Sequence, residues 1–189
     1  MTRQEIQDKF TEEYTKYITR QGSQEFLSWL QSTDFFNAPA STKFHGAYEG
    51  GLAYHSLRVF YETIRLLKSY SDIVTVSGET AAICSLLHDV CKIGCYKTEM
   101  RNVKENGQWV QKPFYTFNED FKFGGHGSKS VFLIQKYMSL SDEEATAINC
   151  HMGSWGNTDE RSVGDAYEQF PFAWILHVAD EACGFVLGA

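Results

Sequence analysis

The sequence predicts an all-α fold with one short extended insertion, and three observations support this. Apolar residues recur at helical spacing through most of the 189 residues. Ser or Thr followed three residues later by Glu, a pattern typical of helix starts, occurs at Thr2 and again at Ser141. Residues 95–125 break the helical repeat with glycines, a proline and alternating aromatic side chains. We therefore expect a helical bundle with a short β-hairpin or extended lid near residues 95–125.

Two helices are expected in the first 40 residues. Thr2 and Glu5 are expected to form a capping box, and apolar residues then follow every three or four positions. Gly22 is expected to end this helix. Ser23 is expected to cap the second helix, and a loop then leads toward residues 50–51.

The next two helices carry the residues of greatest chemical interest. The first is expected over residues 52–69, with His55 on its apolar side. The second is expected over residues 79–92, with His88 and Asp89 close to its C-terminal end. Both helices are apolar on the side that carries these polar groups, so we expect the groups to point into the core.

Three more helices are expected in the last third, over residues 128–138, 141–152 and 172–186. A capping box at Ser141 opens the middle one. A loop is expected between the last two, because that stretch contains Gly153, Gly156 and Gly164.

The composition predicts a single globular domain over residues 1–189, because hydrophobic residues make up 43% and no Gly-, Ser- or Pro-rich linker divides the chain. N-terminal helices are expected in residues 1–40 and the core of the site in residues 45–185. Five irregularly spaced cysteines fit reduced thiols better than a disulfide framework. The polar start and the lack of a long apolar run predict a cytoplasmic protein without a membrane span.

The net charge of −7 argues against capture of long nucleic acids, which requires a basic surface. A nucleotide substrate remains compatible with this charge, because bound metal ions supply positive charge locally.

Four residues form the most informative pattern. His55 lies in GGLAYHSLRV, His88 and Asp89 lie in SLLHDVCKIG, and Asp180 lies in WILHVADEA. An imidazole or carboxylate that faces a core is costly unless it is paired or binds a metal. Imidazole and carboxylate together suit Mn, Fe, Ni, Co or Zn, and carboxylates also suit Mg. We therefore expect these four side chains to surround one divalent metal ion.

Two further histidines extend this set. His126 lies in FGGHGSKS and His151 lies in AINCHMGSW. With Asp89 as a bridge, the six residues would suffice for two ions. His55, His88, Asp89 and Asp180 would then hold one ion, and Asp89, His126 and His151 the other. The alternative for His126 and His151 is that each is an ordinary helix residue.

The motifs HGAYEGGLAYHSLRV, LLHDVCKIG, GGHG and LHVADEA, with the INCH of AINCHMG, resemble those of the HD-domain phosphohydrolase superfamily. The resemblance covers about residues 45–185. Within the superfamily the chain is most similar to the HD domain of bacterial 3′-to-5′ exoribonucleases, which carry a GGL-x-x-H segment. The resemblance implies an all-α fold and a metal-dependent phosphohydrolase or phosphodiesterase.

The resemblance also implies roles for individual residues. It implies that Lys92, in the HD-x-x-K pattern, faces a substrate phosphate, and that the six His and Asp residues ligate metal. We expect Asp89 and Lys92 to be catalytic, although Lys92 could also be an ordinary lysine in the last helical turn that complements the helix dipole. The chain has His45-Gly46 where the exoribonucleases usually have two adjacent histidines, and Glu49 where they usually have a basic residue. His45 is retained as a candidate substrate contact. The separate oligonucleotide-binding domain of those enzymes is not recognisable in this sequence. We therefore expect a small nucleotide, phosphate ester or short oligonucleotide as substrate.

Other residues have two interpretations each. His177 shares a helix face with Asp180 and could orient a carboxylate, or it could bond to backbone. Arg58, one turn past His55, could reach a phosphate or form a surface salt bridge. Basic and aromatic residues in 95–125 could close over the site and stack on a base, or could form only a surface hairpin.

Two other functions are compatible with the sequence. Some members of the superfamily are di-iron oxygenases with the same six ligands, so the ligands alone do not separate an oxygenase from a hydrolase. A non-catalytic module that senses a nucleotide is the second alternative. The complete ligand set and Lys92 favour the metal-dependent hydrolase.

Overall fold

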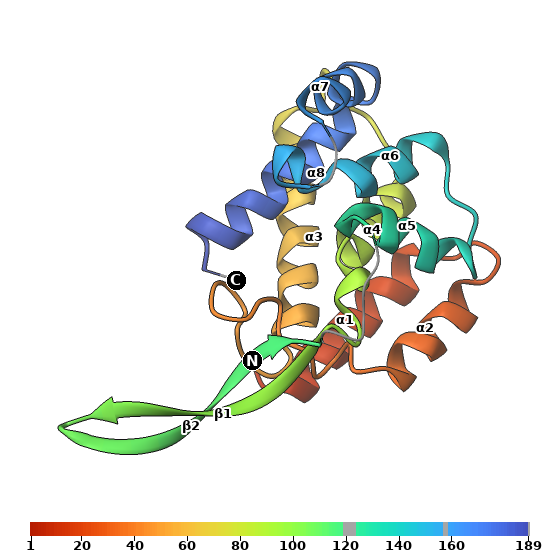
Figure 1. Ribbon diagram of the computed structural model, residues 1–189. Helices are drawn as coiled ribbons and strands as arrows, with labels where there is room; N and C mark the ends of the chain where they lie inside the picture. The colour runs from red at the N-terminus through yellow and green to blue at the C-terminus, as the bar shows by residue number, and fades with distance from the viewer. Residues whose placement is uncertain (119–123, 157–158, 189) are drawn as a thin grey trace.

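The computed structural model describes residues 1–118, 124–156 and 159–188. The described residues form eight α-helices and one antiparallel β-hairpin (Figure 1). The expected all-α fold with a hairpin insertion is therefore confirmed. Residues 119–123 of the expected insertion, and residues 157–158, lie outside the described residues.

The N-terminal helix α1 (Arg3–Tyr17) begins as the sequence predicts. Thr2 and Glu5 form the capping box, in which each side chain bonds to the backbone N–H of the other residue. Phe10 and Tyr14 are fully buried, so the apolar side of α1 belongs to the core.

Helix α2 (Ser23–Ser32) is capped differently from the prediction. Gly22 is the N-cap residue, and Ser23 is already helical. Gly22 has a φ of 86°, and a Cβ there would lie 1.9 Å from the carbonyl oxygen of Tyr137. Only glycine fits this close approach. Helix α2 therefore begins without a side-chain hydrogen bond at its N-cap.

Three helices form the centre of the fold. Helix α3 (Gly51–Ser69) packs against both α4 (Gly78–Leu87) and α8 (Pro171–Glu181), and it runs through the middle of the molecule in Figure 1. Their buried apolar side chains join those of α1 in one cluster. The polar residue His55 of α3 is completely buried within this arrangement.

Helix α4 is shorter than the sequence predicts. It ends at Leu87, not at Lys92. Asp89 leaves the helical conformation, with φ −107° and ψ 14°, and a 3₁₀ turn follows over Val90–Lys92. The helix end was predicted too late because apolar residues keep their helical spacing through this turn. The chain nevertheless bends there, and the bend directs Asp89 inward.

The strands β1 (Tyr96–Glu105) and β2 (Gln108–Phe117) pair from Tyr96 opposite Phe117 to Glu105 opposite Gln108. Asn106 and Gly107 both have positive φ, 50° and 83°, which is typical of the tight turn that joins such strands. The hairpin extends away from the helices (Figure 1). The insertion was expected to be a short β-hairpin or an extended lid, and the structure shows a projecting hairpin.

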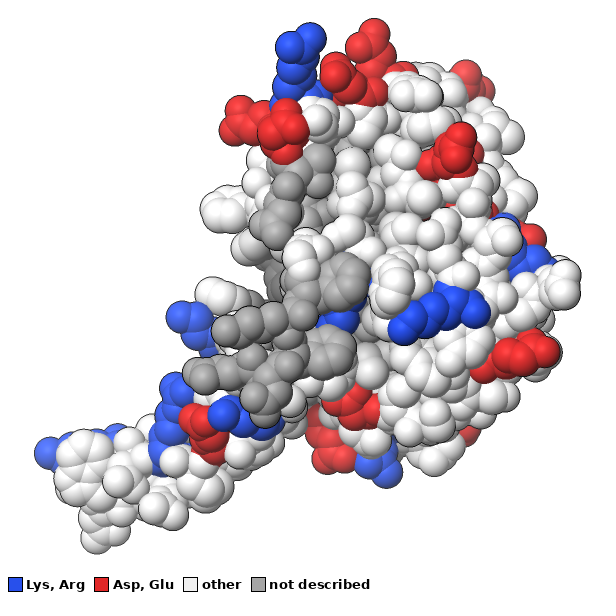
Figure 2. Space-filling view, turned by 45° about the vertical axis from the view of Figure 1, so that its right-hand side comes forward, with Lys and Arg blue, Asp and Glu red and all other residues white. Residues whose placement is uncertain are grey.

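The hairpin carries more basic than acidic residues, in contrast to the chain as a whole. Its cations are visible as blue side chains along the projecting arm in Figure 2. Three of them lie near carboxylates: Lys97 and Arg101 are within 4.0 Å of Glu99, and Lys112 pairs with Glu105.

The second half adds α5 (His126–Gln135), α6 (Asp142–Cys150) and α7 (Glu160–Gln169). Helix α5 begins two residues earlier than expected and ends three residues earlier. The capping box at the start of α6 is confirmed.

Helix α7 corrects the predicted loop between α6 and α8. Asp159 caps this helix by accepting a hydrogen bond from the backbone N–H of Ser162, and Val163 is buried. Gly164 is exposed, with open space where a Cβ would lie. A single exposed glycine costs a helix only about 1 kcal/mol relative to alanine, so Gly164 does not interrupt it.

The end of α8 continues into a π-helical turn over Ala182–Val186, so the predicted helical span of residues 172–186 is close to the observed one. Among the described residues, no helix is both long and apolar enough to cross a membrane.

Candidate metal centre

Five helices or helix ends bring the six predicted ligand residues together. α3 supplies His55, the end of α4 supplies His88 and Asp89, and α8 supplies Asp180. The first residue of α5 and the residue after α6 supply His126 and His151. The chain therefore gathers at one place residues that span more than 120 positions.

One half of the cluster lies around Asp180. The Nε2 atom of His55 lies 2.9 Å from Oδ1 of Asp180, and Nε2 of His88 lies 3.6 Å from the same oxygen. The Oδ2 atom of Asp89 lies 3.4 Å from Nε2 of His88 and 3.8 Å from Nε2 of His55.

The other half lies on the opposite side of Asp89. Its Oδ1 atom lies 3.5 Å from Nε2 of His151 and 3.9 Å from Nε2 of His126. The two oxygens of Asp89 thus face different pairs of histidines. This is the arrangement that a bridging carboxylate requires.

The cluster is closed on most sides. His55, His88 and His151 are completely buried, and Asp89 is 1% exposed. The side chain of His126 is 40% exposed, so the cluster opens toward solvent at His126. A pocket lies beside it, lined by His126 with Gly124, Gly125, Gly127, Ser128, Asn149, Gly156 and Asp159.

The backbone fixes the orientation of two histidines. Nδ1 of His88 donates to the carbonyl oxygen of Ser85 at 2.8 Å, and Nδ1 of His151 donates to that of Ile148 at 2.7 Å. Each ring therefore directs Nε2 toward the cluster. Both Nε2 atoms are buried and have no hydrogen-bond partner among the described residues.

These orphaned nitrogens fit a metal centre. A buried polar atom without a partner is costly, and a cation between the rings and carboxylates would satisfy both nitrogens. Ligand atoms that share one ion at bond lengths of about 2.1 Å lie roughly 3–4 Å apart. The nitrogen-to-oxygen distances of 2.9–3.9 Å fall close to that spacing. The residues present therefore fit one or two divalent ions.

The electrostatics of the cluster favour bound positive charge. Burial opposes ionisation of Asp89 and Asp180, but Lys92 with His88 and His151 for Asp89, and His55 with His88 for Asp180, hold the pKa of each carboxyl well below its ordinary range. Burial also lowers the pKa of His55. Burial opposes protonation of His88 as well, yet Asp89 and Asp180 raise its pKa to about 10. The two buried carboxylates are therefore ionised and stabilise positive charge beside them, here on His88 and Lys92.

Lys92 lies against Asp89. Its Nζ atom is 2.6 Å from Oδ2, and the residue is only 8% exposed. Burial alone would lower the pKa of Lys92, but Asp89 raises it above the ordinary value. The lysine thus places a fixed positive charge at the edge of the cluster.

His45 lies beside the cluster without joining it. The ring of His45 is 4.8 Å from that of His55, and burial lowers the pKa of His45 to about 4, so it is neutral at pH 7. Arg58 contacts the hydroxyl of Tyr54 at 3.5 Å.

His177 bonds to backbone and not to Asp180. Its Nδ1 atom lies 2.7 Å from the carbonyl oxygen of His151, and its ring stacks on Tyr167. Of the two interpretations of His177, the structure shows the bond to backbone, and the ring supports the end of α6.

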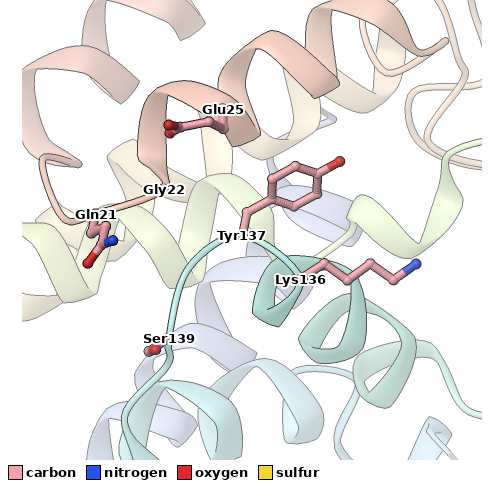
Figure 3. Close-up of a pocket in the computed structure, with 6 residues that line it drawn as sticks. All are labelled: Gln21, Gly22, Glu25, Lys136, Tyr137 and Ser139. Atoms are coloured by element: carbon pink, nitrogen blue, oxygen red, sulfur yellow. The ribbon is translucent and has the colours of Figure 1, made fainter.

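A second surface pocket lies apart from the cluster, between the α1–α2 turn and the end of α5 (Figure 3). None of the predicted site residues lines it. Its lining is formed by Gln21, Gly22, Glu25, Lys136, Tyr137 and Ser139.

Comparison with known proteins agrees with this geometry. The family model of the HD domain matches residues 52–182, which run from the start of α3 to the end of α8 and include all six clustered residues. The chain belongs to the HD domain family. HD domains bind divalent metals, and the family is typically hydrolytic.

A curated relative extends this comparison. Ribonuclease Y of Mycoplasmoides gallisepticum is 28% identical over 111 residues, which are 59% of this chain. The match spans 16% of the length of that protein. No solved structure matched the chain.

Proposed function

We propose that this HD domain is a metal-dependent phosphohydrolase or phosphodiesterase that acts on a nucleotide or short oligonucleotide. The observation that carries the proposal is the division of Asp89 between two pairs of histidines, with Lys92 beside the same carboxylate. His55, His88, Asp89 and Asp180 would hold one ion, and Asp89, His126 and His151 a second.

A divalent cation in this position supplies a water whose pKa falls from 15.7 toward about 7, which makes a nucleophile available at neutral pH. The protein side chains have the remaining tasks. Asp89 is within reach of both halves of the cluster and is suited to orient that water and to accept its proton.

Lys92 is suited to bind the phosphoryl group. A charge fixed in a dry site stabilises the negative charge that develops on phosphoryl oxygens more strongly than the same charge in water. Its contact with Asp89 holds the ammonium group at the cluster, so little reorganisation is needed when substrate binds.

Substrate is expected to enter past His126. This histidine is the most exposed of the six, and the glycine-rich pocket lies beside it. His45 and Arg58 are expected to contact the substrate from the side of α3. The aromatic and basic hairpin would contact a substrate longer than one nucleotide, and the similarity to a ribonuclease supports phosphodiester substrates.

The test loads metal-free protein with Mn²⁺ or Fe²⁺ and screens a panel of nucleotides, cyclic nucleotides and short oligonucleotides. We expect release of phosphate or nucleoside from at least one substrate class, and loss of that activity in Asp89→Asn and Lys92→Met. Lys136→Met is the matched control, because Lys136 is exposed on the far end of α5. Activity that survives Asp89→Asn contradicts the proposal.

The six-residue cluster also fits a di-iron oxygenase, and the same protein samples separate the two reactions. Oxygen uptake by the Fe²⁺-loaded chain without hydrolysis of any ester would favour the oxygenase. Nucleotide binding without either reaction would favour a sensing module. Lys92 favours the hydrolase, because a phosphate ester needs a cation beside the leaving oxygens.

A further inference from the structure

The backbone of Cys91 is held at both polar ends by side chains of helix α5. Its N–H donates to Oγ of Ser130 at 3.1 Å, and its carbonyl oxygen accepts a hydrogen bond from Nζ of Lys129. Cys91 lies between Asp89 and Lys92 in the 3₁₀ turn. Lys129 and Ser130 of α5 therefore fix the position of the turn that carries Asp89 and Lys92.

These contacts replace helical hydrogen bonds. Helix α4 ends at Leu87, so the Cys91 N–H finds its partner in Ser130. Ser130 is fully buried and Lys129 is 5% exposed. A buried lysine is costly unless its ammonium group is bonded. Lys129 is therefore not a solvent-exposed lysine of α5. Its hydrogen bond to the turn satisfies the ammonium group.

Helix α5 joins the turn to one half of the metal centre. His126 is the first residue of α5, and Lys129 and Ser130 follow one turn later. Gly127 brings α5 close to α6, since a Cβ at this position would lie 2.5 Å from the carbonyl oxygen of Ile148. That carbonyl also orients His151. Asp89, His126 and His151 thus belong to one tightly connected unit.

We propose that Lys129 and Ser130 are positioning residues that set the distance from Asp89 to His126 and His151. This inference rests on the proposed two-metal function. Loss of Ser130 leaves the buried N–H of Cys91 without its partner. Loss of Lys129 leaves the carbonyl oxygen of Cys91 with only the weak thiol donor of Cys95, at 3.1 Å, so either change frees the turn to shift. His55, His88 and Asp180 are attached to other helices, so a shift of the turn moves only Asp89 among the four residues of the first half.

The test measures Mn²⁺ binding to the full chain by calorimetry and by the metal content after dialysis. The wild-type chain is expected to bind two ions. Ser130→Ala is expected to lower the affinity for the second ion, the one at Asp89, His126 and His151, by about 10–100-fold. This is the range known for residues that orient ligands. The affinity for the first ion is expected to fall much less, because His55, His88 and Asp180 keep their places and only Asp89 moves. Lys129→Gln should act in the same direction and provides a second variant.

A matched control and a double mutant define the mechanism. Thr63→Val removes a buried hydroxyl of α3 that has no hydrogen-bond partner among the described residues, and it should leave both ions unchanged. In a His126→Ala background the second position is already impaired. Ser130→Ala should therefore weaken Mn²⁺ binding much less there than in the wild type.

The possible results are distinct. If both variants bind two ions with the same affinities as the wild type, the positioning role is overturned and the proposed function stands. Equal weakening of both ions also overturns the role, because the effect is then general. A wild-type chain that binds no Mn²⁺ overturns the proposed function and the inference together.

Discussion

The Nε2 atom of His55 lies 2.9 Å from Oδ1 of Asp180, although the two residues are 125 positions apart in the sequence. The contact joins α3 to α8 at the bottom of a buried cluster of imidazoles and carboxylates. The hydrogen bond compensates for the burial of both groups, and the same two side chains are expected to ligate a metal ion.

Asp180→Ala is expected to remove the ion on the His55 side of the cluster. It deletes the carboxylate that faces both His55 and His88, so the affinity for that ion should fall by more than the roughly 10–100-fold caused by loss of an orienting residue. Calorimetric Mn²⁺ binding measures this. Asp165→Ala, on the exposed side of α7, is the control. Unchanged binding by Asp180→Ala would remove this residue from the ligand set.

Phe10→Ala is expected to destabilise the whole chain by about 3–5 kcal/mol. Phe10 is fully buried and packs edge-on against Phe35 and Phe36 at centroid distances of 5.1 and 5.4 Å. Urea unfolding measures the change. Phe44→Ala, at a position 68% exposed, should shift stability by about 0.5 kcal/mol or less. Two separate unfolding transitions would contradict a single domain that includes residues 1–40.

The pair Arg20–Glu144 is expected to stabilise the chain at neutral pH and to lose that effect in acid. Burial raises the pKa of Glu144, but hydrogen bonds from Arg20 and the Ser141 N–H outweigh it and bring the pKa below the ordinary value of 4.5. A lowered folded-state pKa gives stability that is present above the unfolded pKa and is lost as the pH falls through the folded pKa.

The corresponding test compares urea unfolding of the wild type with Glu144→Gln across pH 3–7. At pH 7 the variant should be less stable by about 1.5–3 kcal/mol, the value of a hydrogen bond to a charged group. The difference should shrink below about pH 4.5. Glu12→Gln, at a side chain 64% exposed, is the control. A difference that stays constant with pH would show that the charge of Glu144 is not responsible.

Removal of the hairpin is expected to leave the fold and metal binding intact. Tyr96 and Phe117 are directly opposite each other, so a two-residue Asn-Gly turn can join them in place of residues 97–116. Most of the removed residues are exposed. Thermal unfolding and Mn²⁺ binding should match the wild type, whereas cleavage of oligonucleotides should fall more than that of a small phosphate ester. An equal loss of activity on both substrates would contradict a hairpin that contacts the longer substrate.

The sequence predicts much of the fold because local signals and tertiary contacts agree there. Helical periodicity and capping boxes at Thr2 and Ser141 identify real helix starts. The six cluster residues could be proposed because each polar group interrupts an apolar helix face, and buried polar groups need a reason. The resemblance to HD domains then supplied their order along the chain.

Other features depend on contacts that no local pattern encodes. After α4 ends at Leu87, the N–H of Cys91 bonds to Ser130 of α5, 39 positions away, a contact that the local sequence does not show. The role of Gly22 depends on a carbonyl of a distant segment. Helix α7 was missed because Gly164 suggested a loop, although its exposed position tolerates glycine. Lys129 and Ser130 carried no sequence signal, since lysine and serine near a helix start are common.

The central claim is that Asp89 bridges two metal ions, and metal content tests it most directly. Wild-type protein and Asp89→Asn should be loaded with Mn²⁺, dialysed and analysed for metal and protein. Asn keeps the size of Asp but loses the charge and one oxygen ligand. We expect close to two ions per wild-type chain and a loss of both in the variant. Two ions retained by Asp89→Asn, or none bound by the wild type, would contradict the account.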